Sequence, residues 1–223
     1  MKTGILASTD RRNAWPTGSE THSQISWVQN SQDAAHFDVF IDLNFDAHPE
    51  RIRDYAGNTQ TLFLLSTVNH TPEAALFNAG LPYRGEKIFG INAIPGFLER
   101  NTLEISDPFG KKEDVSELLT QLPFTSLEWV KSRVGMVTPR IVFMIINEAY
   151  YTMQEGTAAA PDIDTAMKLG TAYPHGPFEW KNKCGIINVY HTLSALYEDT
   201  KEERYKICPA LKTEYLSGGS TSL

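Results

Sequence analysis

Histidine and cysteine side chains are those whose chemistry is available near neutral pH, as base, nucleophile or metal ligand. The two cysteines of this 223-residue chain, Cys184 and Cys208, lack the spacing of a metal or redox pair. We therefore expect buried, inert thiols in a reducing compartment. Neither His70 nor His191 has a carboxylate at helical or strand spacing that would orient it. No metal site is predicted.

A third histidine, His175, stands in the segment Tyr173-Pro174-His175-Gly176-Pro177, whose prolines and glycine exclude helix. We expect it to be a loop residue that packs on Tyr173 or Trp180 rather than a catalytic base. The remaining three histidines lie in polar segments and should be solvated: His22, His36 and His48.

Four consecutive blocks between Pro139 and Thr200 carry the strongest local patterns. In PRIVFMIINEAYYTMQEG, apolar residues recur at three- and four-residue steps and predict a helix that ends at Gly156. In TAAAPDIDTAMKLG, Pro161 and two acidic residues predict a helix start, with Gly170 beyond the end. The shaped segment TAYPHGPFEWKNKCG follows, and IINVYHTLSALYEDT then predicts an amphipathic helix. We expect the aromatic residues Trp180, Tyr190 and Tyr197 to serve the core and a dimer contact.

Short apolar runs alternate with short helical patterns over the first 131 residues. The expected strands are 4–8, 25–28, 38–43, 61–65, 87–91, 102–106 and 126–131, and the expected helices are 49–55, 72–78 and 112–121. This alternation predicts a mostly parallel sheet with helices on its faces. We expect domains at 1–131 and 135–216, followed by a flexible tail at 217–223.

The residues after the first expected strand bear on nucleotide binding. A phosphate-binding turn needs glycines that let the backbone approach a pyrophosphate. Here the sequence is Thr9-Asp10-Arg11-Arg12-Asn13-Ala14-Trp15-Pro16, with no glycine between Gly4 and Gly18. Pro16 is also unfavourable for a helix that would begin there. We expect the phosphate cradle to be missing.

The segments NEA, EG, DIDTAMKLG and YPHGPFEW occur in this order between Gly135 and about Leu211. They closely resemble the C-terminal domain of L-3-hydroxyacyl-CoA dehydrogenases. DVFIDLNFD and FGINAIPGFLERNTLEIS resemble the NAD-binding domain of the same family more weakly, and that half is shorter here. The resemblance implies an α/β plus all-α chain: a truncated, degenerate Rossmann-like domain, then a helical domain. It also implies NAD-dependent oxidation of L-3-hydroxyacyl-CoA in fatty-acid or butanoate metabolism, an acyl-CoA ligand, and a homodimer built through helices between Arg140 and Tyr197.

The resemblance assigns site residues position by position. Family members use a His as base, a Glu that orients it, and a Ser and Asn residues that contact substrate and cofactor. The His position corresponds to Asn92 and the Glu position to Glu104. The Ser corresponds to Val68, or to Asn69 if the alignment shifts by one, and the two Asn positions correspond to Pro95 and Pro139. An acidic residue and a Lys near the cofactor correspond to Asp42 and Arg51.

Without the resemblance, we would expect Glu104 to be a partly exposed carboxylate on a strand. We would expect Asn92 to lie at a strand end and to make local hydrogen bonds. An amide at position 92 has no useful basicity near neutral pH.

Composition narrows the function classes further. The chain is 41% hydrophobic and 21% charged, as in ordinary soluble domains, and its formal net charge is −7. Without a Lys/Arg cluster, nucleic acid is a poor candidate partner. No apolar run approaches the length of a membrane span, and no leader is evident, so we expect a cytoplasmic protein.

Three functions remain open. The first is a 3-hydroxyacyl-CoA dehydrogenase relative that has lost NAD-dependent catalysis and persists as a binding or assembly protein, with no cofactor. The second is an active NAD-dependent dehydrogenase with a rearranged site. The third is a structural partner that keeps only the dimer fold. The missing phosphate turn and base favour the first.

Overall fold

The structure is a computed structural model that describes residues 1–16 and 24–218. The chain divides into two compact units, Met1–Met136 and Val137–Leu223. His22 and most of the expected flexible tail lie outside the described residues. Within the part that is described, no helix has both the length and the apolar character needed to cross a bilayer.

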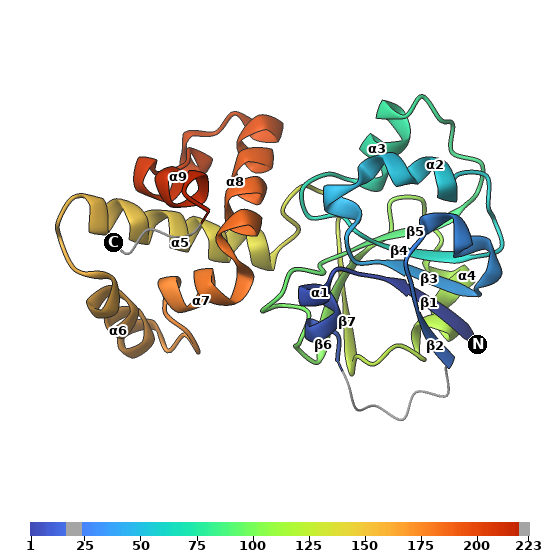
Figure 1. The fold of residues 1–223 in the computed structure, drawn as a ribbon, viewed down its shortest axis with the longest axis horizontal. Coiled ribbons are helices and arrows are strands. Elements are labelled where there is room, and N and C mark those ends of the chain that lie inside the picture. Colours follow the sequence, from blue (N-terminus) through green and yellow to red (C-terminus); the bar gives the residue numbers. More distant parts are fainter. Residues whose placement is uncertain (17–23, 219–223) are drawn as a thin grey trace. The chain divides into compact units, whose positions relative to one another are not determined.

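The first unit is built around one seven-stranded sheet with the order β2-β1-β3-β4-β5-β6-β7 (Figure 1). Neighbouring strands run parallel except β5 and β6, which pair antiparallel. The strand bounds are β1 Lys2–Leu6, β2 Gln24–Val28, β3 Val39–Asp42, β4 Leu62–Ser66, β5 Lys87–Ile91, β6 Thr102–Ser106 and β7 Ser126–Val130.

Helices cover both faces of this sheet. The α-helices are α1 Thr9–Ala14, α2 Ile52–Tyr55, α3 Pro72–Asn78 and α4 Lys112–Leu119, and the 3-10 turns are η1 Ser31–His36, η2 Phe45–Ala47 and η3 Pro49–Arg51. Strands β3 and β4 are buried along their whole length, as expected for central parallel strands that read as continuous apolar runs.

Alternate side chains of these strands feed two separate apolar cores. Ile41 and Leu64 pack with Trp15, which follows α1, and with Val115 of α4. Phe40, Phe63 and Leu65 point to the opposite face, where they pack with Ile52 and Tyr55 of α2 and with Ala75 and Leu76 of α3. The prediction of a mostly parallel sheet covered by helices is confirmed.

Three local expectations need correction. A short helix, α1, does follow the first strand, because Pro16 lies beyond its C-terminal end and removes no hydrogen bond from it. The first strand begins at Lys2 rather than Gly4, since it pairs in register with β2 from Lys2 onward. The expected helix 49–55 is a 3-10 turn followed by a single α-turn.

The second unit is entirely helical among its described residues. It contains α5 Thr138–Gln154, α6 Ala160–Thr171, α7 Pro177–Cys184, α8 Ile186–Thr200, the 3-10 turn η4 Glu203–Tyr205 and α9 Pro209–Leu216. The first, second and fourth sequence blocks form the expected helices α5, α6 and α8, whereas the third block, expected as a shaped loop, also contains the helix α7. Gly170, however, lies inside α6, which ends at Ala172 in the left-handed conformation with φ 55°. The core is formed by buried side chains of α5, α8 and α9, among them Phe143, Ile146, Tyr150, Leu193, Leu196 and Leu211.

The segment between α6 and α7 explains two of the sequence blocks together. Asp164 of α6 accepts hydrogen bonds from the backbone N–H groups of Phe178 (2.8 Å) and Glu179 (3.2 Å) at the start of α7. Glu179 in turn accepts from the N–H of Gly176 at 3.0 Å. A Cβ atom on Gly176 would lie 2.3 Å from Asp164 Oδ1. DID and YPHGPFEW are therefore the two halves of one helix cap.

Candidate functional site

The order of the strands creates one topological switch point in the sheet. From β1 the chain moves to β2 on one side, and β3 pairs with β1 on the other side. In open α/β sheets, ligands bind in the crevice at the carboxyl ends of the strands at such a point. The candidate site is therefore the group of side chains that follows β1, β3 and β4.

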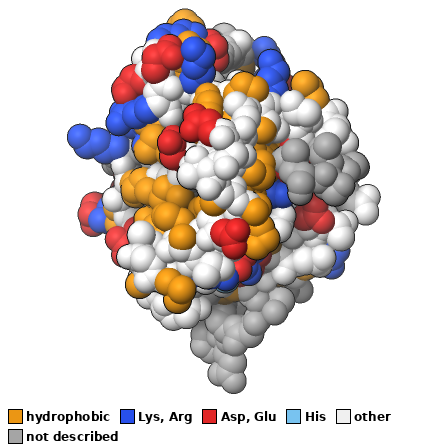
Figure 2. Space-filling view, turned by 90° about the vertical axis from the view of Figure 1, so that its left-hand side faces the viewer, with side chains coloured by type: hydrophobic (Ala, Val, Ile, Leu, Met, Phe, Trp, Pro, Cys, Tyr) orange, Lys and Arg blue, Asp and Glu red, His pale blue; other side chains and the backbone are white. Residues whose placement is uncertain are grey.

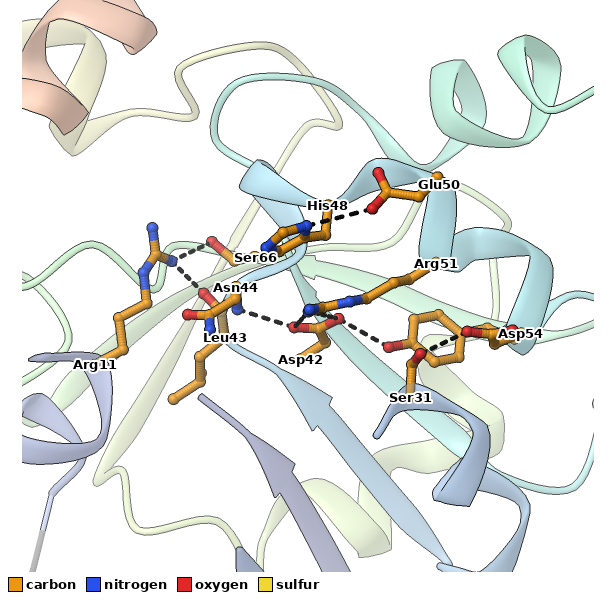
Figure 3. A network of polar contacts seen from close by, with 11 residues as sticks. Arg11, Ser31, Asp42, Leu43, Asn44, His48, Glu50, Arg51, Asp54 and Ser66 are labelled. Carbon is orange, nitrogen blue, oxygen red and sulfur yellow. Dashed lines mark hydrogen bonds and ion pairs between the residues drawn. The ribbon is translucent and has the colours of Figure 1, made fainter. Parts of the chain in front are cut away.

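Arg11 of α1 lies across this crevice (Figure 3). Its Nη1 donates hydrogen bonds to the backbone carbonyl of Leu43, directly after β3, and to Ser66 Oγ at the end of β4, the latter at 2.8 Å. The residue is only 9% exposed. Burial lowers the pKa of Arg11, and the nearby carboxylates of Asp46 and Asp42 oppose this shift. Protein atoms, rather than an open turn, thus occupy the place between β1 and β3.

Asp46 in η2 is a second anchor of the same region. It accepts hydrogen bonds from Ser66 Oγ (2.6 Å) and from the backbone N–H groups of Val68 (3.0 Å) and Asn69 (2.7 Å). Its Oδ1 also lies 3.8 Å from His70 Nδ1. This carboxylate comes from another loop, 24 positions before His70, and not from the helical or strand spacing that the sequence analysis considered.

Asp42 and Arg51, the residues assigned to the cofactor region, contact each other. Arg51 Nη1 lies 3.3 Å from Asp42 Oδ2, and the Tyr55 hydroxyl donates to the same oxygen at 2.8 Å. The backbone N–H of Asn44 donates to the other carboxylate oxygen at 2.9 Å. Burial raises the pKa of Asp42, while the hydrogen bond from Tyr55 and the charge of Arg51 oppose the shift. The pair forms a self-contained cluster at the end of β3 (Figure 3).

Asn92 and Glu104 lie opposite each other where β5 and β6 pair antiparallel. The backbone N–H of Asn92 donates to the carbonyl of Glu104 at 3.1 Å. Asn92 Oδ1 accepts from the N–H of Ile94 at 3.3 Å, which confirms the expected local hydrogen bonding, whereas its Nδ2 is buried with no partner among the described residues. Glu104 is 5% exposed, so the expectation of a partly exposed carboxylate is wrong.

The other positions that the resemblance assigns to the site have structural roles. Val68 is fully buried, and its carbonyl accepts from the N–H of Gly135 at 2.6 Å. The N–H of Asn69 is bound to Asp46. Pro139 is buried in the first turn of α5, a position where a missing N–H costs nothing. It belongs to the helical unit, whereas Asn92 and Glu104 belong to the sheet unit.

The remaining reactive side chains are placed as follows. The His175 ring meets Trp180 edge-on with 4.9 Å between centroids, which confirms the expected packing. His191 Nε2 lies 3.3 Å from the Tyr215 hydroxyl. Cys184 and Cys208 are buried, as expected, and they form no disulfide. No group of three or more potential metal ligands occurs within residues 1–16 and 24–218.

Comparisons with known proteins follow the division into units. Residues 135–220 match the family model described as 3-hydroxyacyl-CoA dehydrogenase, C-terminal domain. The 3-hydroxyadipyl-CoA dehydrogenase of Escherichia coli K12 is 44% identical over 82 residues, which are 37% of this chain and 17% of that protein. The probable 3-hydroxybutyryl-CoA dehydrogenase of Bacillus subtilis is 26% identical over 206 residues, which are 88% of this chain and 70% of that protein.

Among solved structures, the (S)-3-hydroxybutyryl-CoA dehydrogenase of Ralstonia eutropha superposes with a TM-score of 0.69 at 17% identity, covering 97% of this chain and 94% of that one. This likeness establishes the fold alone: a Rossmann-type N-terminal domain followed by a helical C-terminal domain. The sequence matches to the Escherichia coli and Bradyrhizobium diazoefficiens relatives span only 17% and 29% of those proteins.

Proposed function

Because the C-terminal domain of this chain is that of the 3-hydroxyacyl-CoA dehydrogenase family, we propose that the chain is a member that has lost NAD-dependent catalysis and acts as a binding or assembly protein. The observation that carries this proposal is the buried Arg11 side chain in the crevice between β1 and β3.

Arg11 bears on cofactor binding in two ways. A dinucleotide needs its pyrophosphate close to backbone N–H groups at the turn after the first strand, where glycines permit the approach. In this chain Thr9–Ala14 carries side chains at every position, and the Arg11 guanidinium already bonds Leu43 and Ser66 there. To admit a cofactor, the protein would have to break these bonds and take the Arg11 cation away from the buried carboxylate of Asp46.

The catalytic position supports the same proposal. The family reaction needs a base that takes the hydroxyl proton while hydride leaves for the cofactor. Asn92 stands at the position that the resemblance assigns to this base, and Glu104, the assigned orienting carboxylate, is buried next to its backbone. A positioned general base contributes roughly 10²–10⁴-fold to a rate. Turnover of L-3-hydroxybutyryl-CoA or acetoacetyl-CoA should therefore be absent, or at least about a hundredfold below that of an active relative measured in parallel.

The test is calorimetry with NAD and NADH, followed by an absorbance assay at the NADH band with both CoA thioesters. We expect no saturable cofactor binding up to roughly 1 mM, a standard free energy of about −4 kcal/mol. We expect no turnover from Asn92→His alone, since that variant still has Arg11 in the crevice. A micromolar dissociation constant, or ordinary turnover by the unmodified protein, would overturn the proposal. In the latter case His70→Gln and His175→Gln would locate the base.

We further propose that the helical unit forms a homodimer and that an acyl-CoA is the retained ligand. Several large apolar side chains of this unit are exposed: Val137, Ile141, Leu169, Ile187 and Leu216 are 46%, 47%, 83%, 60% and 69% accessible. Figure 2 shows several groups of apolar side chains on the face of the helical unit turned to the viewer, with acidic side chains among them. Large exposed apolar side chains in this number support an interface.

A further inference from the structure

Strand β7 forms one edge of the seven-stranded sheet. Among the described residues it pairs with β6 alone, and none of its five residues is buried. The central strands β3 and β4, in contrast, are buried at every position. An edge strand presents backbone N–H and C=O groups that can bond a further strand.

The register of β6 and β7 shows which backbone groups point outward. The carbonyl of Glu104 in β6 accepts a hydrogen bond from the residue that follows β5, so the backbone groups of its two neighbours on β6 face β7. At the start of β7, the N–H of Ser126 donates to the carbonyl of Asn101 at 3.3 Å. Because the direction of the backbone groups alternates along a strand, Leu127 and Trp129 direct their N–H and C=O groups away from β6.

A groove of about 350 Å³ lies beside this edge, between β7 and α4. Its apolar lining includes Leu127 and Trp129 of β7 and the nearby Phe124. On α4 it is lined by Lys112 and Ser116, which are four residues apart and therefore lie on one face of the helix. The ammonium group of Lys112 lies 4.5 Å from the centre of the Trp129 ring. Among the described residues that line the groove, Lys112 carries the only charge.

We propose that this groove binds an extended segment of a partner protein, which joins the sheet as a further strand next to β7. The backbone of the segment bonds the outward N–H and C=O groups of Leu127 and Trp129. Alternate side chains of an added strand lie on the groove side, where apolar ones pack on Leu127, Trp129 and Phe124. A carboxylate of the segment complements the charge of Lys112. The groove contains none of the positions assigned by the family resemblance, so the proposal does not depend on the loss of catalysis.

A second copy of this chain fits the edge less well than a segment of another protein. If two β7 strands paired antiparallel through Leu127 and Trp129 of each copy, the two Glu128 side chains would lie directly opposite each other. Like charges in that position destabilise a strand pair. We therefore assign the groove to a partner with a different sequence.

The test is an NMR titration of the full chain that follows the backbone amides of Leu127 and Trp129. The probe is an acetylated and amidated peptide in which valine alternates with threonine and an aspartate stands at one end. We expect saturable shifts of both amide signals. One comparison peptide has lysine in place of the aspartate, and another has N-methyl groups on the backbone amides that face β7. Each should bind at least about tenfold more weakly, because the first loses the charge pair and the second loses the hydrogen bonds between strands.

A charge exchange on the protein supplies a variant and a matched control. Lys112→Glu, at an exposed position, should weaken binding of the aspartate peptide at least about tenfold and make the lysine peptide the tighter ligand. Lys212→Glu changes an exposed lysine of α9 outside the groove and should leave both affinities unchanged. Amide spectra of the two variants confirm that the fold is retained.

Three results would overturn the proposal. The first is the absence of a saturable shift of the Leu127 and Trp129 amides with the aspartate peptide. The second is an N-methylated peptide that binds as tightly as the unmodified one, or an unchanged peptide preference in Lys112→Glu. The third is a shift of the same two amides that grows with protein concentration when no peptide is present, which would assign the edge to a second copy.

Discussion

The guanidinium of Arg11 is a buried cation that donates hydrogen bonds to the Leu43 carbonyl and to Ser66 Oγ, with the carboxylates of Asp46 and Asp42 nearby. Removal of one partner from such a group leaves the others desolvated without compensation. We expect Arg11→Ala to lower the free energy of unfolding by about 3 kcal/mol, measured by urea denaturation. The control is Arg12→Ala, whose guanidinium lies over the Trp27 ring at 4.6 Å on the surface and should cost about 0.5–1 kcal/mol. An equal loss in the two variants would contradict a buried role for Arg11.

His70 predicts a pH dependence of stability. Its pKa in the folded protein is lowered by burial, whereas the unfolded chain has the ordinary value of about 6.5. As the pH falls below about 6.5, the unfolded state binds a proton that the folded state does not, so stability is lost towards the folded-state pKa. His70→Gln has no such proton, so its stability relative to the unmodified protein should improve between pH 7.5 and pH 5.

Urea titrations at these two pH values give the comparison, with His36→Gln as the exposed-histidine control. A stability difference between the unmodified protein and His70→Gln that stays constant with pH would contradict the neutral, buried imidazole.

At the level of single residues, some features of the site could be predicted from the sequence and others could not. The absence of a glycine turn after the first strand was visible, but the destination of Arg11 was not, because its partners Leu43 and Ser66 follow it by 32 and 55 positions. The His70–Asp46 contact was missed for the same reason: it joins two loops that only the parallel sheet brings together. One sequence signal could have indicated that protein atoms fill the crevice. This signal is the arginine that stands where a phosphate-binding turn would have glycines.

At the scale of elements, α6 and α7 share one cap. Asp164 supplies two acceptors to α7 that no residue at the start of α7 provides, since the N-cap is Gly176. We expect Asp164→Ala to lower the free energy of unfolding by about 1–2 kcal/mol, measured by thermal and urea unfolding. Asp162→Ala, in the exposed first turn of α6, is the matched control and should cost about 0.3–1 kcal/mol. Equal effects would show that the contact across the two helices contributes nothing.

Gly176→Ala tests the close approach of Gly176 to the Asp164 side chain by changing the glycine instead of the aspartate. Its new Cβ would lie within 2.4 Å of three Asp164 atoms, and we expect a loss of about 1–3 kcal/mol, the usual range for overpacking. In an Asp164→Ala background the same substitution should cost clearly less, because the clashing carboxylate is gone. A double-mutant cycle of unfolding free energies measures this difference. Additive losses would contradict the geometry.

Elements were easier to predict than contacts. The sheet strands and the helices α5, α6 and α8 of the second unit follow from short-range periodicity and from Gly and Pro positions, which depend on local chemistry alone, whereas α7 and α9 were not predicted. The wrong predictions concern residues whose local sequence pattern indicates one structure and whose tertiary contacts produce another. Gly170 was taken for a helix stop, but α6 continues past it to Thr171. The local sequence predicts a partly exposed carboxylate at Glu104, but the residue is only 5% exposed in the folded protein.

At the scale of the whole molecule, the exposed apolar side chains of the helical unit predict self-association. We expect light scattering at tens of micromolar to give twice the monomer mass of 25.0 kDa. Ile187→Glu and Leu169→Glu place charges at side chains that are 60% and 83% exposed, and at least one should shift the mass towards the monomer. Phe77→Glu, at an equally exposed residue of the sheet unit, is the control. A monomer at this concentration would contradict the proposed homodimer.

The division at Met136 also has a consequence for how such a chain changes over generations. Each unit encloses its own buried side chains, so a substitution in one core leaves the packing of the other intact. Natural selection can therefore act on the two units separately. The match to the family model falls on residues 135–220, which belong almost entirely to the second unit. In such a lineage, mutations that closed the crevice of the first unit would have left the inherited helical unit folded and open to a new role.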